Sequence, residues 1–149
     1  GNVYPYSDAQ ADIIFALCAE IIRRHDIKPW NIVAHSDIAV GRKIDPGSKF
    51  PWAKLAKLGI GASPLPDELQ ERIVRGRVAT PAYFRQLLKD YGYAVGPDDA
   101  GLKLSVEAFQ RHFRPAKIDG LIDVESTAIL ESLVRRYQST PYRAVEVRP

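Results

Sequence analysis

Apolar residues recur at helical spacing near the start of the chain. The stripe has six members, which are Ile13, Ile14, Leu17, Cys18, Ile21 and Ile22. Ser7 precedes this stripe and Gln10 follows three residues later, a spacing at which each side chain can accept a backbone N–H at a helix start. The pattern predicts a helix over residues 8–24 with one strongly apolar, buried face.

A second apolar run covers Trp30–His35 and directly follows Pro29. A short run of this kind after a proline predicts a buried strand. One strand cannot form a sheet, and no other segment has a clear strand pattern. We therefore expect an α/β fold whose remaining strands lie in an N-terminal part that the given sequence lacks.

The last part of the chain predicts three short amphipathic helices. Thr80-Pro81 is typical of a helix start, and the stripe behind it ends at Gly92. Ser105 can cap a second helix and Asp123 a third. Short helices joined by tight turns predict a small three-helix bundle.

Composition and charge narrow the classes of function. The chain has 149 residues, of which 46% are hydrophobic and 26% charged, as in globular proteins. Its 21 Lys and Arg residues against 18 Asp and Glu residues give a net charge of only +3, which argues against nucleic acid as the partner. The single cysteine excludes an intrachain disulfide and a cysteine zinc cluster. The longest apolar run, Ile13–Ala19, is too short for a transmembrane segment.

The segment that carries candidate chemistry is the loop after the expected strand. His35 stands at the end of that strand, and Asp45 follows ten residues later. Imidazole and carboxylate groups both bind zinc, and a catalytic zinc needs three such ligands with one open position. Lys43 lies two residues before Asp45 and could stabilise an oxyanion. The residues alone leave open a hydrogen-bonded histidine, a turn-forming aspartate and a solvated lysine.

Residues 35–52, with the sequence HSDIAVGRKIDPGSKFPW, resemble the C-terminal signature of the type-2 N-acetylmuramoyl-L-alanine amidases. These zinc amidases share a fold with peptidoglycan-recognition proteins. The resemblance covers residues 4–61 and implies that His35 and Asp45 bind Zn²⁺ and that Lys43 supports catalysis. The sequence departs from the pattern at Val40, where many members have proline.

The resemblance implies hydrolysis of the amide bond between N-acetylmuramic acid and L-alanine in peptidoglycan or muropeptides. In the family, the first zinc histidine and the catalytic glutamate come from upstream strands, and neither His25 nor His112 matches that missing ligand. We therefore expect the N-terminal half of the amidase as a missing or separate polypeptide. The alternative is a non-enzymatic peptidoglycan-binding module.

A second resemblance covers residues 80–138, where Phe109-Gln110 is followed by Asp119-Gly120 and Thr127. This pattern is similar to the three-helix peptidoglycan-binding domain, although a bundle used only for packing or dimerisation stays open. The expected division is a catalytic part at 1–61, a linker with a short helix at 62–79, the binding domain at 80–138 and a tail at 139–149. The expected location is the bacterial cell envelope, in the periplasm, with the cytoplasm left open and any lipid anchor outside this chain.

Overall fold

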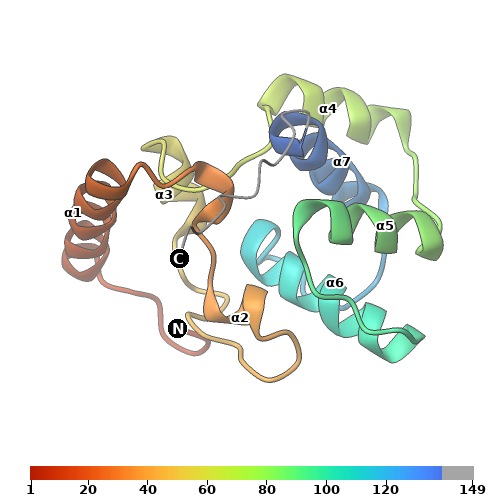
Figure 1. The fold of residues 1–149 in the computed structure, drawn as a ribbon, viewed down its shortest axis with the longest axis horizontal. Coiled ribbons are helices and arrows are strands. Elements are labelled where there is room, and N and C mark those ends of the chain that lie inside the picture. The colour runs from red at the N-terminus through yellow and green to blue at the C-terminus, as the bar shows by residue number, and fades with distance from the viewer. Residues whose placement is uncertain (139–149) are drawn as a thin grey trace, which may run out of the picture.

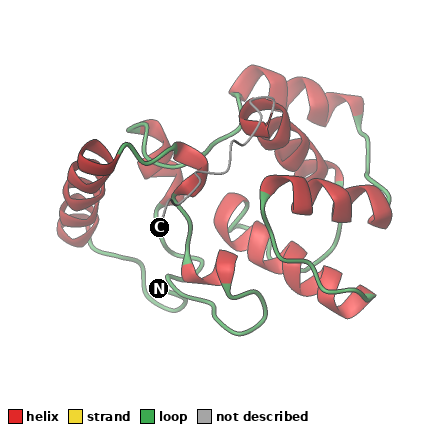
Figure 2. Cartoon of the chain, in the orientation of Figure 1, coloured by secondary structure: helices red, strands yellow, loops and turns green. Residues whose placement is uncertain are grey.

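The computed structural model describes residues 1–138, and every regular element in this range is a helix (Figures 1 and 2). In chain order these are α1 (Asp8–His25), the 3₁₀ helix η1 (Pro29–Asn31), α2 (His35–Ile38), α3 (Trp52–Lys57), α4 (Pro66–Arg75), α5 (Pro81–Tyr91), α6 (Asp99–Phe113) and α7 (Val124–Gln138). Helix α1 lies at one end of the molecule, and α4 to α7 pack together at the other (Figure 1). None of these helices is long and apolar enough to cross a membrane. The expected tail, 139–149, lies outside the described residues.

The expectation of an α/β fold is wrong for this chain, because residues 1–138 contain no strand (Figure 2). Within the expected strand, Trp30 belongs to η1 and His35 begins α2. The backbone between them is extended, with φ −92° and ψ 97° at Ile32 and φ −88° and ψ 162° at Ala34. A strand needs a neighbour for its backbone hydrogen bonds, and the described residues supply none. Apolar β-branched side chains therefore give an extended connection here and not a sheet.

Helix α1 confirms the predicted start. The Gln10 N–H donates to Ser7 Oγ at 3.2 Å, and the Ser7 N–H donates to Gln10 Oε1 at 3.0 Å. One face of the helix packs on a small core whose buried members are Ala11, Phe15, Leu55 and Ile60. The apolar stripe is only partly covered, however. Three of its members face solvent within this chain, with exposed fractions of 69%, 58% and 40% at Ile13, Leu17 and Ile21.

Helices α4 to α7 surround the larger core. Its fully buried side chains include Phe84, Leu88, Val106, Phe109, Leu130 and Leu133. Thr80 caps α5 as predicted, because its Oγ1 accepts the Tyr83 N–H at 3.3 Å. The predicted cap of α6 is wrong. Asp98 caps that helix, and the Ser105 hydroxyl lies inside it and donates to the Gly101 carbonyl at 2.9 Å.

The Phe-Gln and Asp-Gly pairs of the sequence meet at the turn between α6 and α7. Gln110 is fully buried, and its Oε1 accepts the N–H groups of Asp119 at 3.0 Å and Gly120 at 2.9 Å. Its Nε2 donates to the Leu121 carbonyl at 2.9 Å. Gly120 has φ +69°, and a Cβ there would lie 2.6 Å from the Lys103 side chain. These pairs therefore specify the shape of a turn.

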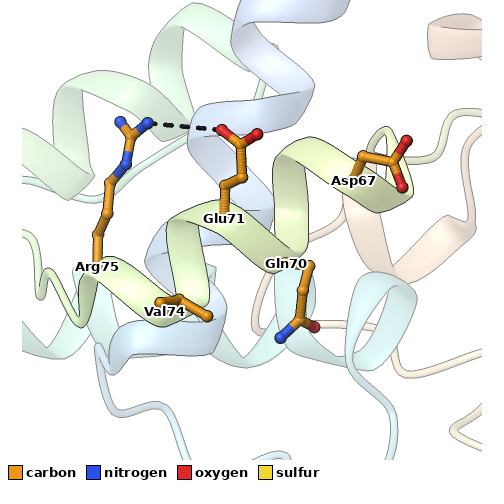
Figure 3. Close-up of a pocket in the computed structure, with 5 residues that line it drawn as sticks. All are labelled: Asp67, Gln70, Glu71, Val74 and Arg75. Carbon is orange, nitrogen blue, oxygen red and sulfur yellow. Dashed lines mark ion pairs between the residues drawn. The ribbon is translucent and has the colours of Figure 1, made fainter.

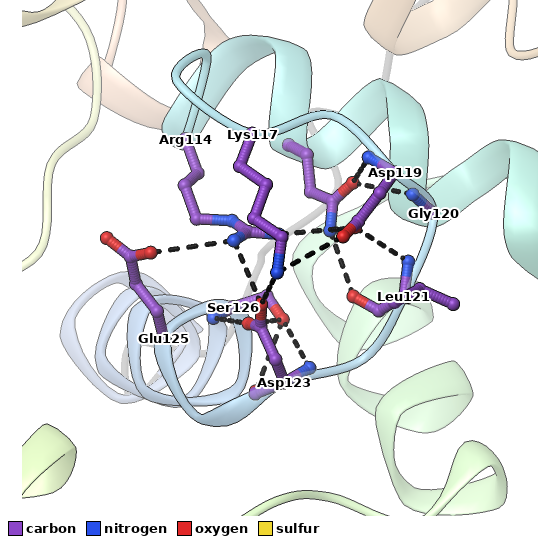
Figure 4. A network of polar contacts seen from close by, with 9 residues as sticks. Arg114, Lys117, Asp119, Gly120, Leu121, Asp123, Glu125 and Ser126 are labelled. Atoms are coloured by element: carbon purple, nitrogen blue, oxygen red, sulfur yellow. Dashed lines mark hydrogen bonds and ion pairs between the residues drawn. The ribbon is translucent and has the colours of Figure 1, made fainter.

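Charged side chains close the same turn (Figure 4). The buried Arg114 guanidinium donates to Asp123 at 2.9 Å, and Lys117 pairs with Asp119 at 3.2 Å. The Leu121 N–H, which donates to Asp119 at 3.0 Å, is the main cause that lowers the pKa of this carboxyl to about 2. The Asp123 carboxylate also accepts the Ser126 N–H at 2.9 Å, as predicted for the cap of α7.

Candidate active site

The structure brings the two predicted ligands, His35 and Asp45, together. His35 is the first residue of α2, and Asp45 lies in the loop that follows this helix. His35 Nδ1 lies 3.0 Å from Asp45 Oδ2, and the two side chains are 48% and 60% exposed. An imidazole and a carboxylate therefore lie together at one solvent-accessible place on the surface.

Backbone hydrogen bonds fix the loop that joins these residues. The Ser36 N–H donates to the Asp45 carbonyl at 3.0 Å, so the start of α2 is tied directly to the second ligand. The N–H groups of Arg42 and Lys43 both donate to the Ala39 carbonyl, at 2.9 and 3.1 Å. The spacing of the pair thus depends on main-chain contacts as well as on the side chains themselves.

The first residues of the chain hold the far side of the loop. Tyr6 donates its hydroxyl to the Pro46 carbonyl at 2.9 Å, and the Ser48 N–H donates to Asn2 Oδ1 at 3.1 Å. Gly47 has φ +95°, and a Cβ there would lie 2.5 Å from the Gly1 carbonyl carbon. Only glycine fits at such a contact, so the shape of the loop requires the glycine of the Asp-Pro-Gly sequence.

Lys43 lies on the same loop and is exposed. Within residues 1–138, no hydrogen bond or ion pair holds its ammonium group. Its backbone position is fixed by the bond to Ala39, while its side chain stays available to a bound ligand.

The described residues do not complete a metal site. They contain no group of three or more His, Cys, Asp or Glu side chains that could hold a metal ion. His25 is the last residue of α1 and is exposed, and His112 is buried in α6. His35 and Asp45 therefore stand as two donors without a third from residues 1–138.

Sequence reasoning missed a buried carboxylate near this site, that of Asp37. Its Oδ2 accepts the Ala34 N–H and a bond from His112 Nδ1, each at 2.7 Å. Its Oδ1 accepts the Tyr93 hydroxyl at 2.8 Å. Burial, and then the Asp37 charge, raises the pKa of Tyr93, which keeps this hydroxyl protonated as a donor. The position of Asp37 in the first turn of α2 was the only local signal, because its other partners are 56 and 75 residues away.

One hollow lies away from the Asp37 cluster and another lies at it. The first runs along the outer face of α4, where Asp67, Gln70, Glu71, Val74 and Arg75 all come from that helix (Figure 3). Its ion pair, Glu71 with Arg75 at 3.5 Å, is exposed and so contributes little. The second, a cavity of about 480 Å³, is lined by Asp37, Tyr93 and His112 themselves, and its other walls are mostly apolar.

Comparison with known proteins finds similarity to N-acetylmuramoyl-L-alanine amidases. Residues 1–48, which include both His35 and Asp45, match the family model described as N-acetylmuramoyl-L-alanine amidase. The chain is 42% identical over 138 residues to the N-acetylmuramoyl-L-alanine amidase AmiD of Escherichia coli strain K12, which covers 89% of this chain and 50% of AmiD. It is also 44% identical over 50 residues to the 1,6-anhydro-N-acetylmuramyl-L-alanine amidase AmpD of Enterobacter cloacae, covering 34% of this chain and 27% of AmpD.

Solved structures agree with the sequence matches. The complex of E. coli AmiD with the substrate anhydro-N-acetylmuramic acid-L-Ala-D-γ-Glu-L-Lys superposes with a TM-score of 0.85 at 40% identity, over 90% of this chain and 54% of that one. AmpDh3 from Pseudomonas aeruginosa gives a TM-score of 0.84 at 39% identity, over 90% of this chain and 55% of that one. The chain spans about half the length of the amidases it matches. These relatives support the prediction of an amidase, and over that length the chain is a homologue of the N-acetylmuramoyl-L-alanine amidases.

Proposed function

We propose that this chain is part of an enzyme that uses zinc to hydrolyse the amide bond between N-acetylmuramic acid and L-alanine. One observation carries the proposal. His35 Nδ1 and Asp45 Oδ2 lie 3.0 Å apart on an exposed loop, inside the segment that matches the amidase family model. Peptidoglycan or muropeptides are the proposed substrates, because the relative AmiD is described in complex with an anhydromuropeptide.

The two side chains fit a shared zinc ion. Donors at about 2.0–2.2 Å from a tetrahedral zinc stand roughly 3.3–3.6 Å apart, and the observed 3.0 Å separation is close to this range. Their exposure leaves room for a metal and for the open position that a catalytic zinc needs. Because residues 1–138 offer no third donor, we propose that a further histidine and a glutamate base come from a part of the protein outside these residues. The uncovered face of α1 gives such a part a surface to pack on.

The chemistry follows from the loop. A zinc ion held by His35 and Asp45 would polarise the scissile carbonyl and activate a water molecule. Lys43 would place its ammonium near the oxygen on which negative charge develops. The helical part over residues 80–138 would hold the polymer, and the proposed location is the bacterial cell envelope.

Replacement of Lys43 by methionine should impair turnover and leave folding intact. Loss of one group that stabilises the oxyanion lowers kcat by roughly 100- to 1000-fold, and kcat/KM should fall by a similar factor if Lys43 acts only in the transition state. An exposed substitution changes stability by only about 0.5 kcal/mol. Steady-state kinetics on a muropeptide, with Lys49→Met as a control from the same exposed loop, measure the effect. Equal kcat values for the two variants would reduce Lys43 to a surface charge.

The proposed function is tested by zinc content and muropeptide cleavage measured on the same preparation. We expect the purified protein, including the part that supplies the further histidine and the glutamate, to contain zinc, to release the peptide from the muramic acid, and to lose and regain activity on chelation and zinc addition. A protein that binds peptidoglycan but neither retains zinc nor cleaves it would support the alternative, a non-enzymatic binding module.

A further inference from the structure

The Asp37 carboxylate joins two parts of the chain that are distant in sequence. Its side chain is only 5% exposed, and its partner His112 is 4% exposed. Besides the Ala34 N–H, both of its hydrogen-bond donors come from the part of the chain that follows the linker, namely Tyr93 and His112. An ionised carboxylate only accepts hydrogen bonds, so His112 carries its proton on Nδ1 and donates. A single buried group thus receives three donors.

One of these hydrogen bonds fixes the backbone of Ala34, the residue that precedes His35. Asp37 accepts the Ala34 N–H, which closes the first turn of α2 from the inside. Ala34 itself carries no capping side chain. Two residues further on, the Ser36 N–H donates to the Asp45 carbonyl. The orientation of the first turn of α2 therefore sets the position of His35. Because the Ser36 N–H is bonded to Asp45, it also sets the distance between His35 and Asp45.

Aromatic rings fix His112 in the orientation that this contact needs. Its imidazole stacks on Trp52, with ring centroids 3.7 Å apart and planes inclined by 21°. Phe113 stacks on the imidazole as well, with a centroid distance of 4.0 Å and an interplanar angle of 2°. The donor nitrogen is held in place by packing, and it does not depend on solvent.

We propose that Tyr93 and His112 are positioning residues for the His35–Asp45 pair. They contact neither side chain, and they act through Asp37 on the first turn of α2. The inference rests on the proposed zinc site and gives the helical part of the chain a second role, which is to set the geometry of that site. Loss of groups that do not touch the metal but orient its ligands commonly weakens metal binding by about 10- to 100-fold.

The test compares two variants that each remove a buried hydroxyl. In one variant the lost hydroxyl is bonded to Asp37, and in the other it is not. Tyr93→Phe deletes one hydroxyl and its bond to Asp37. The matched control is Tyr137→Phe, because Tyr137 is equally buried but bonds to Ser63. We expect zinc affinity, measured by competition with a chromophoric chelator, to fall roughly 10-fold in Tyr93→Phe and to stay near wild type in Tyr137→Phe. Amide exchange at Ala34 should accelerate only in Tyr93→Phe.

Two substitutions of His112 separate its donor from its packing. His112→Phe keeps an aromatic ring in the stack and removes the donor, whereas His112→Asn keeps a donor close to the position of Nδ1. Zinc affinity should fall in the first and recover largely in the second. If His112→Phe fails to fold, Tyr93→Phe decides the question alone.

The outcomes distinguish this inference from the proposed function. Wild-type protein without zinc affinity would contradict the proposed function, while faster exchange at Ala34 in Tyr93→Phe would still support the positioning of the loop. Wild-type zinc binding with equal affinity and equal exchange in Tyr93→Phe and Tyr137→Phe would overturn the positioning role.

Discussion

Replacement of Asp45 by alanine is expected to abolish zinc retention and, with it, amide hydrolysis. The variant leaves His35 as the only proposed ligand from this chain, and a catalytic zinc needs three protein donors. The fold should survive, because an ion pair this exposed contributes about 1 kcal/mol or less. A stabilising role for the pair therefore does not explain why the loop brings these groups together.

Metal analysis after gel filtration and muropeptide cleavage measure this effect. Asp12→Ala is the matched control, since it removes an exposed carboxylate from α1, away from the loop. Zinc should be stoichiometric in the control and undetectable in Asp45→Ala. If Asp45→Ala retains zinc at the control level, the assignment of Asp45 as a ligand is wrong.

Replacement of Asp37 by alanine should lower the free energy of unfolding by about 3–5 kcal/mol. The change leaves the Ala34 N–H, the Tyr93 hydroxyl and the His112 Nδ1–H without their acceptor, and all three residues are buried. Each buried donor without a partner costs about 1–3 kcal/mol. The cost is large for one residue because three separate elements lose the group that joins them.

Urea denaturation followed by circular dichroism measures this loss. Asp90→Ala provides the comparison, because that carboxylate is exposed and, among residues 1–138, accepts a hydrogen bond only from Gln86. The control should change stability by about 0.5 kcal/mol. A loss below about 1 kcal/mol in Asp37→Ala would show that solvent or a neighbouring group replaces the carboxylate.

Predictions from the sequence succeeded where the deciding contacts are local. The starts of α1 and α5 depend on hydrogen bonds across three residues, from Ser7 to Gln10 and from Thr80 to Tyr83, so the sequence pattern contains all that is needed. The prediction that Ser105 caps α6 was wrong because Asp98 and Ser105 are both of residue types that cap helices. Only the packing of the first turns of α6 decides between them.

The strand at Trp30–His35 failed for a different reason. Apolar β-branched residues are compatible with a strand, but a sheet exists only where a second strand supplies hydrogen bonds, and the local pattern carries no information about that neighbour. The site also divides into contacts that a local motif predicts and contacts that depend on the folded structure. The motif around His35 and Asp45 identified the pair, whereas the partners of Asp37 become neighbours only after the chain has folded.

The short segment between the two cores has a mechanical consequence. Its composition is that of a flexible linker, yet Ile60 and Ala62 are buried, the Ser63 N–H donates to Tyr137 at 3.2 Å, and Arg136 donates to the Ser63 carbonyl at 2.7 Å. The segment is therefore held in place by packing and hydrogen bonds. We infer that it connects the site loop and the helices α4 to α7 rigidly and does not act as a hinge. If a polymer bound both parts, as proposed above, little freedom would be lost when the second contact forms.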